Sequence, residues 1–360
     1  MPAGDSAMRR GSIRNRAGSV IRALGAAGLL GLALACGAPH PPEPVSLSLL
    51  ALADTGARPD DPPRVRAQLA VGSALEAEDR RLPVDALLLL GDHFYDSGLR
   101  EDELVARVRA NLVRPYCRFL ALGAPRSPEV ESACELPGDE RHPVPLYAVL
   151  GNHDYMTPGS DKLQRETLPL FLANWRMPEP PAAVAELGHG VSLVLFDSDP
   201  VFRGAAPDGL ARALRESAGP WRILAAHQPI AAVGTSEREA YASFRARVVA
   251  EIAAAGVPVQ LYLSGHEHNL QVLTMDPPAP PLHVISGGGS GARSLHDVNP
   301  RRRAGIAAAG YARVDLMGEG EAERLVVTLM RVPAAALRIF GPSRQAARFS
   351  VDRAGNVREE

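Results

Sequence analysis

Apolar runs along the chain end repeatedly in polar residues. Most of these runs are continuously apolar, which is typical of strands buried on both faces. The expected strands cover Val45–Ala53, Ala86–Leu90, Leu146–Leu150, Val191–Phe196, Arg222–Ala226 and Pro258–Leu263. Helix-patterned stretches lie between them, at Val65–Arg80, Glu101–Val113, Leu163–Asn174, Gly209–Ser217 and Glu237–Ala255. This alternation predicts a layered α/β domain.

The pattern changes to β segments after Gln271. These segments lie near Val284 and at Tyr311–Leu316, Leu325–Arg331 and Arg348–Val351. We expect them to add strands to a second sheet rather than to form a separate domain. In open α/β sheets, ligands bind beyond the carboxyl ends of the strands, which is where the polar residues of this chain fall.

The first 35 residues have the pattern of an export signal. Arginines precede the apolar run Ala23–Ala35, which is shorter than the about 20 residues that a membrane-spanning helix needs. The run ends at Cys36 and resembles a bacterial lipoprotein signal, so we expect cleavage before Cys36 and lipidation of its side chain. Ordinary secretion is the alternative, and the Arg9-Arg10 pair also leaves twin-arginine export open.

Residues 36–44 are expected to form a tether and residues 45–360 the folded domain. The tether is rich in proline, which makes a stiff, extended spacer. The domain contains a proline-rich and charge-rich insertion at about residues 114–143, which holds Cys117 and Cys134. Two cysteines in an exported protein are more often paired than free. We therefore expect a Cys117–Cys134 disulfide in a protein of the bacterial cell envelope, anchored to a periplasmic or outer-membrane face, with two free thiols as the alternative.

The amino-acid composition and the net charge argue against several classes of protein. Hydrophobic residues make up 46% of the 360 residues and charged residues 22%, which are values near the globular average. Disordered and fibrous proteins are excluded. The formal charge is -2, and removal of residues 1–35 takes away five arginines and Asp5, which leaves a mature chain at -6. A nucleic-acid partner is not expected, because binding a phosphate backbone requires a basic surface.

The polar residues at the strand ends form a set of metal donors. They offer carboxylate, phenol, amide and imidazole groups, which suit zinc, iron or manganese. The set is Asp54, Asp92, Tyr95, Asn152, His153, His227, His266 and His268. Asp92 follows a strand at a tight turn and is the best candidate to bridge two ions, which two-metal hydrolases hold about 3.5–4 Å apart. His266 and His268 point to the same side of an extended segment, so each can reach one ion.

In chain order these clusters resemble those of the calcineurin-like metallophosphoesterases. Within that superfamily the chain is most similar to the purple acid phosphatases, especially the small tartrate-resistant type. The residues that carry the resemblance are Asp54-Thr55-Gly56, Gly91-Asp92-His93-Phe94-Tyr95, Gly151-Asn152-His153-Asp154-Tyr155 and Gly265-His266-Glu267-His268. The resemblance implies a four-layer α/β/β/α sandwich of two mixed sheets flanked by helices.

The resemblance also implies a role for each site residue. One ion would be held by Asp54, Tyr95 and His268, and the second by Asn152, His227 and His266, with Asp92 bridging the two. His153 would face the substrate as a phosphate ligand or proton donor, and Asp154 would orient it. Two positions depart from the pattern: His93 replaces an asparagine of the small family members, and Ala226 replaces a histidine that many relatives carry.

The implied cofactors are two metal ions, Fe(III) and a divalent iron, zinc or manganese. The implied function is a dinuclear-metal phosphoester hydrolase, an acid-phosphatase-like phosphomonoesterase that acts on small-molecule phosphoesters through a metal-bridging hydroxide. A phosphodiesterase or nucleotide pyrophosphatase on the same site is the first alternative. A noncatalytic surface-binding lipoprotein is a remote one, because it would be expected to lack a ligand and this chain lacks none.

Two further features stay outside the ligand set. The glycine-rich run Ser286–Gly291 lacks the lysine and the helix of a P-loop, so we expect a turn beside the site, with a phosphate cradle as the alternative. Asp197 ends a strand but fits no ligand position.

Overall fold

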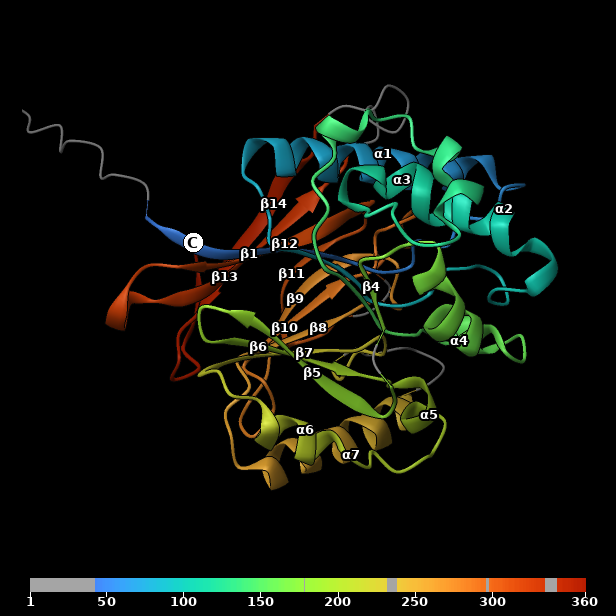
Figure 1. Cartoon of the computed structure of the whole chain (residues 1–360). Coiled ribbons are helices and arrows are strands. Elements are labelled where there is room, and N and C mark those ends of the chain that lie inside the picture. The colour runs from blue at the N-terminus through green and yellow to red at the C-terminus, as the bar shows by residue number, and fades with distance from the viewer. Residues whose placement is uncertain (1–42, 178, 232–237, 296–297, 334–341) are drawn as a thin grey trace, which may run out of the picture. The chain divides into compact units, whose positions relative to one another are not determined.

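The computed structural model describes residues 43–177, 179–231, 238–295, 298–333 and 342–360 (Figure 1). The predicted signal peptide, Cys36 and most of the predicted tether lie outside the described residues. Within the described ranges, no helix combines the length and the apolar character needed to cross a membrane. The folded unit comprises Glu43–Glu360.

The first sheet contains eight strands in the order β15-β14-β13-β12-β1-β2-β3-β4. Its strands are β1 (Val45–Leu52), β2 (Ala86–Leu89), β3 (Leu146–Ala148), β4 (Trp175–Arg176), β12 (Gly310–Met317), β13 (Arg324–Arg331), β14 (Arg344–Val351) and β15 (Val357–Glu359). Strands β1 to β4 are parallel. Strand β12 pairs antiparallel with β1, and β13, β14 and β15 each pair antiparallel with the strand before them. The expectation that the C-terminal β segments join a second sheet is therefore wrong for β12–β14. The reason is a long-range pairing of β1 with β12, in which Leu49 lies opposite Val314.

The second sheet contains seven strands in the order β11-β9-β10-β8-β7-β6-β5. Its strands are β5 (Ala182–Gly188), β6 (Val191–Phe196), β7 (Trp221–Ala225), β8 (Leu261–Ser264), β9 (Leu270–Thr274), β10 (Leu282–Ser286) and β11 (Arg302–Ile306). Strands β6, β7, β8 and β10 are parallel, while β5, β9 and β11 run antiparallel to their neighbours. Both sheets are therefore mixed.

The helices are shorter than the sequence pattern predicts, except for two. They are α1 (Pro62–Arg81), α2 (Leu104–Val108), α3 (Arg114–Tyr116), α4 (Ser160–Lys162), α5 (Asp199–Phe202), α6 (Leu210–Glu216) and α7 (Arg238–Ala255). Helix α1 begins after Asp61, whose carboxylate accepts a hydrogen bond from the Arg64 backbone amide at 3.2 Å. The helices expected at Glu101–Val113 and Leu163–Asn174 are instead broken into short α, 3₁₀ and π turns.

Three apolar layers hold the fold together. Alternate side chains of the two sheets, such as Leu49, Leu88, Ile223 and Leu263, fill the space between them. Residues of α1 to α3 pack on the outer face of the first sheet, and α6 and α7 pack on the outer face of the second. Figure 1 shows α1, α2 and α3 on one side of the strands and α6 and α7 on the other. The predicted α/β/β/α sandwich is confirmed.

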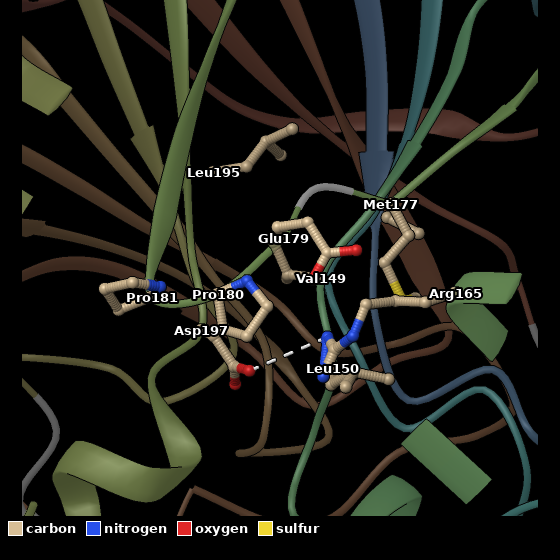
Figure 2. Close-up of a pocket in the computed structure, with 10 residues that line it drawn as sticks. Val149, Leu150, Arg165, Met177, Glu179, Pro180, Pro181, Leu195 and Asp197 are labelled. Carbon is tan, nitrogen blue, oxygen red and sulfur yellow. Dashed lines mark ion pairs between the residues drawn. The ribbon is translucent and has the colours of Figure 1, made fainter. Parts of the chain in front are cut away.

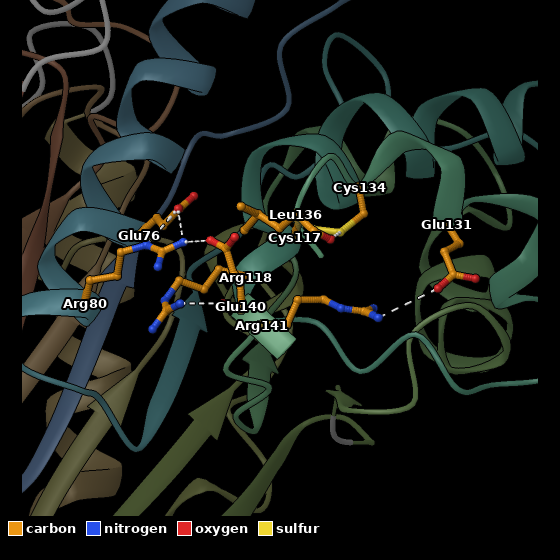
Figure 3. Close-up of a disulfide and its surroundings, with 9 residues drawn as sticks. All are labelled: Glu76, Arg80, Cys117, Arg118, Glu131, Cys134, Leu136, Glu140 and Arg141. Atoms are coloured by element: carbon orange, nitrogen blue, oxygen red, sulfur yellow. Dashed lines mark hydrogen bonds and ion pairs between the residues drawn. A yellow bond between two sulfur atoms is a disulfide. The ribbon is translucent and has the colours of Figure 1, made fainter. Parts of the chain in front are cut away.

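The insertion at residues 114–143 contains short helical turns closed by a disulfide. Cys117 and Cys134 are bonded, with their Cα atoms 5.3 Å apart (Figure 3). The predicted pairing is thus present. Closing a loop of this length stabilises a fold by about 3 kcal/mol, chiefly by restricting the unfolded chain.

Buried Asp79 of α1 fastens the insertion to the domain. Its carboxylate accepts a hydrogen bond from Arg118 Nε at 2.6 Å and lies 3.0 Å from His142 Nδ1. Arg80 of the same helix forms an ion pair with Glu140, which Figure 3 shows beside the disulfide. The insertion is therefore held against α1.

Candidate metal centre

The predicted donors meet at one edge of the two sheets. Asp54 follows β1, Asp92 follows β2 and Asn152 follows β3, so the carboxyl ends of parallel strands bring all three together. His227 follows β7 and His266 follows β8 of the second sheet. Backbone hydrogen bonds tie these turns together: Asp54 donates to Gly91 at 3.0 Å, and Gly265 donates to His227 at 3.0 Å.

The first group consists of Asp54, Tyr95 and His268, all of them buried. The Tyr95 hydroxyl donates to Asp54 Oδ1 at 2.8 Å and lies 2.9 Å from His268 Nε2. His268 Nε2 also lies 3.3 Å from Asp54 Oδ1. Three donor atoms from distant parts of the chain therefore converge on one point.

The second group consists of Asn152, His227 and His266. Asn152 Oδ1 lies 3.1 Å from His227 Nε2 and 2.9 Å from His266 Nδ1, and the two ring nitrogens are 3.3 Å apart. The remaining ring nitrogen of His227, Nδ1, donates to the Leu90 carbonyl at 2.8 Å. Ser198, which sequence reasoning missed, accepts the His227 backbone amide at 3.1 Å and steadies the turn.

Asp92 lies between the two groups. Its Oδ2 is 3.5 Å from His227 Nε2, and its Oδ1 accepts a hydrogen bond from the His153 backbone amide at 2.9 Å. One ligand atom from each of Asp54, Asp92 and His227 fits within a mutual distance of 4.8 Å, with all three residues buried. Asp92 thus has the position expected of a residue that joins two sites.

Four of these donors have a left-handed backbone. Their φ angles are 60° for Asp54, 55° for Asp92, 72° for His266 and 44° for His268. Residues other than glycine rarely adopt this backbone conformation. Those that do are concentrated at functional sites, where the surrounding structure holds them. The turns therefore hold the donor groups in the cluster at a conformational cost.

Glycines allow the close packing of the turns. A Cβ atom on Gly151 would lie 2.2 Å from Asp92 Oδ1, so any other residue would displace that carboxylate. A Cβ atom on Gly56 would lie 2.4 Å from the backbone nitrogen of Phe94. No side chain, and hence no ligand, fits at position 56.

The protonation of His227 provides a test of whether the cluster fits a cation. A carbonyl oxygen only accepts hydrogen bonds, so the contact with Leu90 places the proton on Nδ1. Burial lowers the pKa of His227 to about 4, which keeps the ring neutral and leaves a lone pair on Nε2. That lone pair faces two oxygen acceptors, Asn152 Oδ1 and Asp92 Oδ2. A cation between these groups would satisfy the lone pair and both oxygens, so the residues fit one.

Burial also shifts the pKa values of the other donors, downward for the histidines and upward for the acids. Burial, followed by neighbouring positive groups, lowers the pKa of His268 to about 2, and burial lowers that of His266 to about 3. Burial raises the pKa of Asp54 and Asp92, and burial and Asp54 raise that of Tyr95 well above its ordinary value. Bound cations reverse these shifts for acids, because positive charge favours the ionised form.

His153 lies at the open side of the cluster and is half-buried, with a side-chain exposure of 26%. Its ring packs edge-on against Tyr95 at 4.7 Å between centroids, and its Nδ1 contacts the Asp96 carbonyl. Its Nε2 lies 4.0 Å from Asp92 Oδ2. His153 thus borders the cluster with its second nitrogen directed toward it.

Asp154 does not orient His153, contrary to expectation. Its buried carboxylate accepts the backbone amides of Gly151 at 2.9 Å and His93 at 3.1 Å, and a hydrogen bond from Gln164. The His93 ring packs against Trp175 with 5.7 Å between centroids, behind the donor turns. Asp154 and His93 therefore support the backbone that carries the donors, because a buried carboxylate facing two amides stabilises the turn rather than a neighbouring ring.

Asp197 lies in a separate contact network. Its carboxylate accepts a hydrogen bond from the Tyr155 hydroxyl and lies 3.9 Å from Arg165 Nη1, beside a small cavity that Glu179 and Pro180 also line (Figure 2). Burial raises the pKa of Asp197 to about 6. As expected from the sequence, it takes no part in the cluster that contains Asp54 and Asp92.

The glycine-rich run Ser286–Gly291 lies against the first donor group. Ser290 Oγ donates to the Asp54 carbonyl at 2.6 Å, and the Ala53 amide donates to the Ser286 carbonyl at 2.8 Å. The run is a turn beside the cluster, as one of the two sequence-based alternatives predicts.

Comparison with solved structures places the fold among known ones. The chain is similar to GAP50, described as the anchor in the inner membrane complex of Plasmodium, with a TM-score of 0.53, 16% identity, and coverage of 79% of this chain and 84% of that chain. It is also similar to PhoD, with a TM-score of 0.56, 13% identity, and coverage of 88% of this chain and 72% of that chain. Identities this low show a shared fold only. No curated protein matches the chain in sequence.

A match to a family profile goes further, because it covers more than half of the chain. Residues 47–270 match the profile described as Calcineurin-like phosphoesterase, a span that contains all of the donor residues from Asp54 to His268. Members of this family are metal-dependent phosphoester hydrolases, and the buried cluster of carboxylates and imidazoles fits that chemistry. The chain belongs to the calcineurin-like phosphoesterase family.

Proposed function

We propose that the chain is a phosphomonoesterase of the purple acid phosphatase type. The observation that carries the proposal is the Tyr95 hydroxyl, which lies 2.8 Å from Asp54 Oδ1 and 2.9 Å from His268 Nε2. The wider superfamily places a histidine at the position of Gly56, where this chain has no room for a side chain. Tyr95 therefore supplies the donor that would otherwise be missing.

Each donor group corresponds to one ion. Asp54, Tyr95 and His268 would hold the first, which we propose to be ferric, because a phenolate is a hard anionic ligand. Asn152, His227 and His266 would hold the second, a divalent iron, zinc or manganese. Asp92 would contact both. When bound, the two ions supply an activated water molecule and neutralise charge on the phosphate.

The chain's own residues complete the chemistry. His153 would bind the phosphate or protonate the leaving oxygen, because it borders the cluster and its Nδ1 contact with Asp96 leaves Nε2 free to act. Asp154 would act indirectly, since it holds the backbone of the turns that carry Asp92 and Asn152. Burial of the cluster excludes bulk water from the donors and strengthens each electrostatic contact.

Replacement of His153 by alanine tests its role. We expect the variant to retain its metal ions, because His153 lies outside both donor groups. Turnover should fall by about 10² to 10⁴, the usual effect of removing a proton donor, and the loss should be greatest for substrates with poor leaving groups. Steady-state hydrolysis of a series of aryl and alkyl phosphates, together with metal analysis, measures both.

The exposed turn at His189 offers a control, since asparagine tolerates its left-handed backbone. His189→Asn should leave turnover unchanged. If His153→Ala hydrolyses an alkyl phosphate as fast as the wild-type protein does, His153 has no role in the reaction.

Diesters should be poor substrates for the wild-type protein, and faster hydrolysis of diesters than of monoesters would favour the phosphodiesterase alternative.

We also propose that the protein is exported and tethered to a membrane of the bacterial cell envelope through a lipid on Cys36. The support is the sequence pattern before Cys36 and the start of β1 at Val45, directly after the predicted tether. The described residues contain no helix suited to span a membrane. Cys36→Ser should therefore move the protein from the membrane fraction to the soluble fraction, as measured by fractionation of expressing cells. A wild-type protein found only in the soluble fraction would contradict the anchor.

A further inference from the structure

Arg107 of helix α2 is a buried arginine that binds neutral groups behind the metal centre. The residue is 6% exposed, and the Glu103 carboxylate lies 3.6 Å from its guanidinium, beyond hydrogen-bond distance. Its Nη2 donates to the Tyr95 carbonyl at 2.7 Å, and its Nε donates to Asn111 Oδ1 at 2.9 Å. A guanidinium is costly to bury unless an acid pairs closely with it, so this arrangement points to a role beyond stability.

The bond to Tyr95 fixes the turn that carries the phenol donor. The Arg107 guanidinium also lies over the ring of Phe94, with its central carbon 5.7 Å from the ring centroid. Both Phe94 and Tyr95 are buried, and the Tyr95 amide donates to the Gly56 carbonyl at 2.8 Å. The backbone of Tyr95 is therefore held at its carbonyl by Arg107 and at its amide by the turn that carries Asp54.

The Asp54 turn is joined to the same arginine through Asn111, which is buried. Asn111 Oδ1 accepts the hydrogen bond from Arg107 Nε, and Asn111 Nδ2 donates to the Ala57 carbonyl at 2.7 Å. The two side chains thus link the turns whose donors, Asp54 and Tyr95, meet at 2.8 Å.

We propose that Arg107 is a positioning residue of the metal centre, which sets the place of the Tyr95 phenol relative to Asp54 and so the affinity for the ion that they share. This inference rests on the proposed function, because it takes Tyr95 as a ligand. Arg107 contacts a carbonyl, an amide side chain and a phenyl ring, so it acts through the turn and not as a ligand. Groups that orient metal ligands contribute about 10- to 100-fold to metal affinity or activity.

Arg107→Met tests this role, because methionine keeps an unbranched stem and removes the hydrogen-bond donors. We expect the affinity for the bound metal ions, measured by competition with a chelator, to fall about 10- to 100-fold. The absorption band expected from a Tyr95 phenolate bound to iron should shift in wavelength. With p-nitrophenyl phosphate, kcat should fall while KM stays nearly unchanged, since no group that contacts the substrate is removed.

Arg107→Lys provides a second variant, read in the same assays if Arg107→Met does not fold. Lysine keeps the positive charge but lacks the planar fork that lets arginine bind two acceptors at fixed positions. It should therefore retain part of the metal affinity. Metal affinity and a band unchanged from the wild type in both variants would overturn the inference.

Arg222→Met is the matched control. Arg222 is likewise buried, at 9% exposure, and binds neutral oxygens: its Nε donates to Ser217 Oγ at 2.6 Å and its Nη2 to the Ser217 carbonyl at 3.1 Å. It lies at the start of β7, at the opposite end of that strand from His227. The control should lower Tm about as much as Arg107→Met and leave metal affinity, absorption and turnover unchanged. Equal losses of metal affinity in the two variants would contradict a positioning role.

A double-mutant cycle separates positioning from a general loss of stability. On the Tyr95→Phe background, Arg107→Met should weaken metal binding by less than about threefold, because the donor that Arg107 positions is absent. A loss of the same size on both backgrounds would overturn the inference even in a protein that hydrolyses p-nitrophenyl phosphate. A wild-type protein that binds two ions but hydrolyses no phosphoester would instead contradict the proposed function, and the cycle would still decide the role of Arg107.

Discussion

Asp92→Asn is expected to lower phosphoester hydrolysis by about 10³-fold or more. We propose that Asp92 contacts both ions, and asparagine keeps its shape but removes the negative charge that the two cations would share. The charge stabilisation that metal ions provide amounts to several kcal/mol, and each 1.36 kcal/mol changes the rate about tenfold. Steady-state kinetics with p-nitrophenyl phosphate measure the loss of turnover, and metal analysis of the purified variant measures the loss of bound metal.

Asp197→Asn is the matched control. It also replaces a buried strand-end aspartate by its isosteric amide, but Asp197 contacts Tyr155 and Arg165 rather than the donor cluster. The control should keep both metal content and turnover. Equal losses in the two variants would show that Asp92→Asn acts through the stability of the fold, and full activity of Asp92→Asn would exclude a bridging role.

Aerobically purified wild-type protein is expected to show a visible absorption band, and Tyr95→Phe is expected to abolish it. The band would arise from charge transfer between the Tyr95 phenolate and the proposed ferric ion. Burial and Asp54 raise the pKa of Tyr95 well above its ordinary value, so the protein alone keeps the phenol protonated and only a strongly charged ion would ionise it. Phenylalanine retains the ring that packs against His153 but removes the donor oxygen.

Metal affinity should fall together with the colour. Loss of a ligand's hydrogen-bond partner alone costs about 10- to 100-fold in metal affinity, and loss of the ligand itself should cost more. Tyr155→Phe removes a partly buried hydroxyl that bonds Asp197 outside the cluster, and it should keep the band. A colourless, fully active wild-type protein that contains only zinc or manganese would show that Tyr95 does not determine the metal.

The layered fold could be predicted because its central strands are continuous apolar runs. Strands β1, β2, β3 and β6 lie within the runs expected from the sequence, and β7 and β8 each extend one residue beyond theirs. The edge strand β5 was missed because Ala182–Gly188 is only half-buried and has no clear alternation of apolar and polar residues. The sheet to which β12 belongs could not be predicted, since its pairing with β1 joins opposite ends of the domain.

The donor residues could be predicted because each follows a strand, and parallel strands bring such positions to one edge. Contacts that depend on the path of the turns could not. The Asp154 carboxylate reaches two backbone amides, including that of His93, and no spacing in the sequence indicates this.

The proposal that the protein is a metal-dependent phosphomonoesterase is tested most directly by measuring hydrolysis of p-nitrophenyl phosphate before and after metal removal. We expect the purified protein to contain two ions per chain, to lose activity when a chelator removes them, and to regain it when iron and a divalent metal are added back. Hydrolysis of the monoester at the original rate by fully metal-depleted protein would exclude metal-dependent catalysis. A protein with both ions bound that hydrolyses no monoester would exclude the phosphomonoesterase.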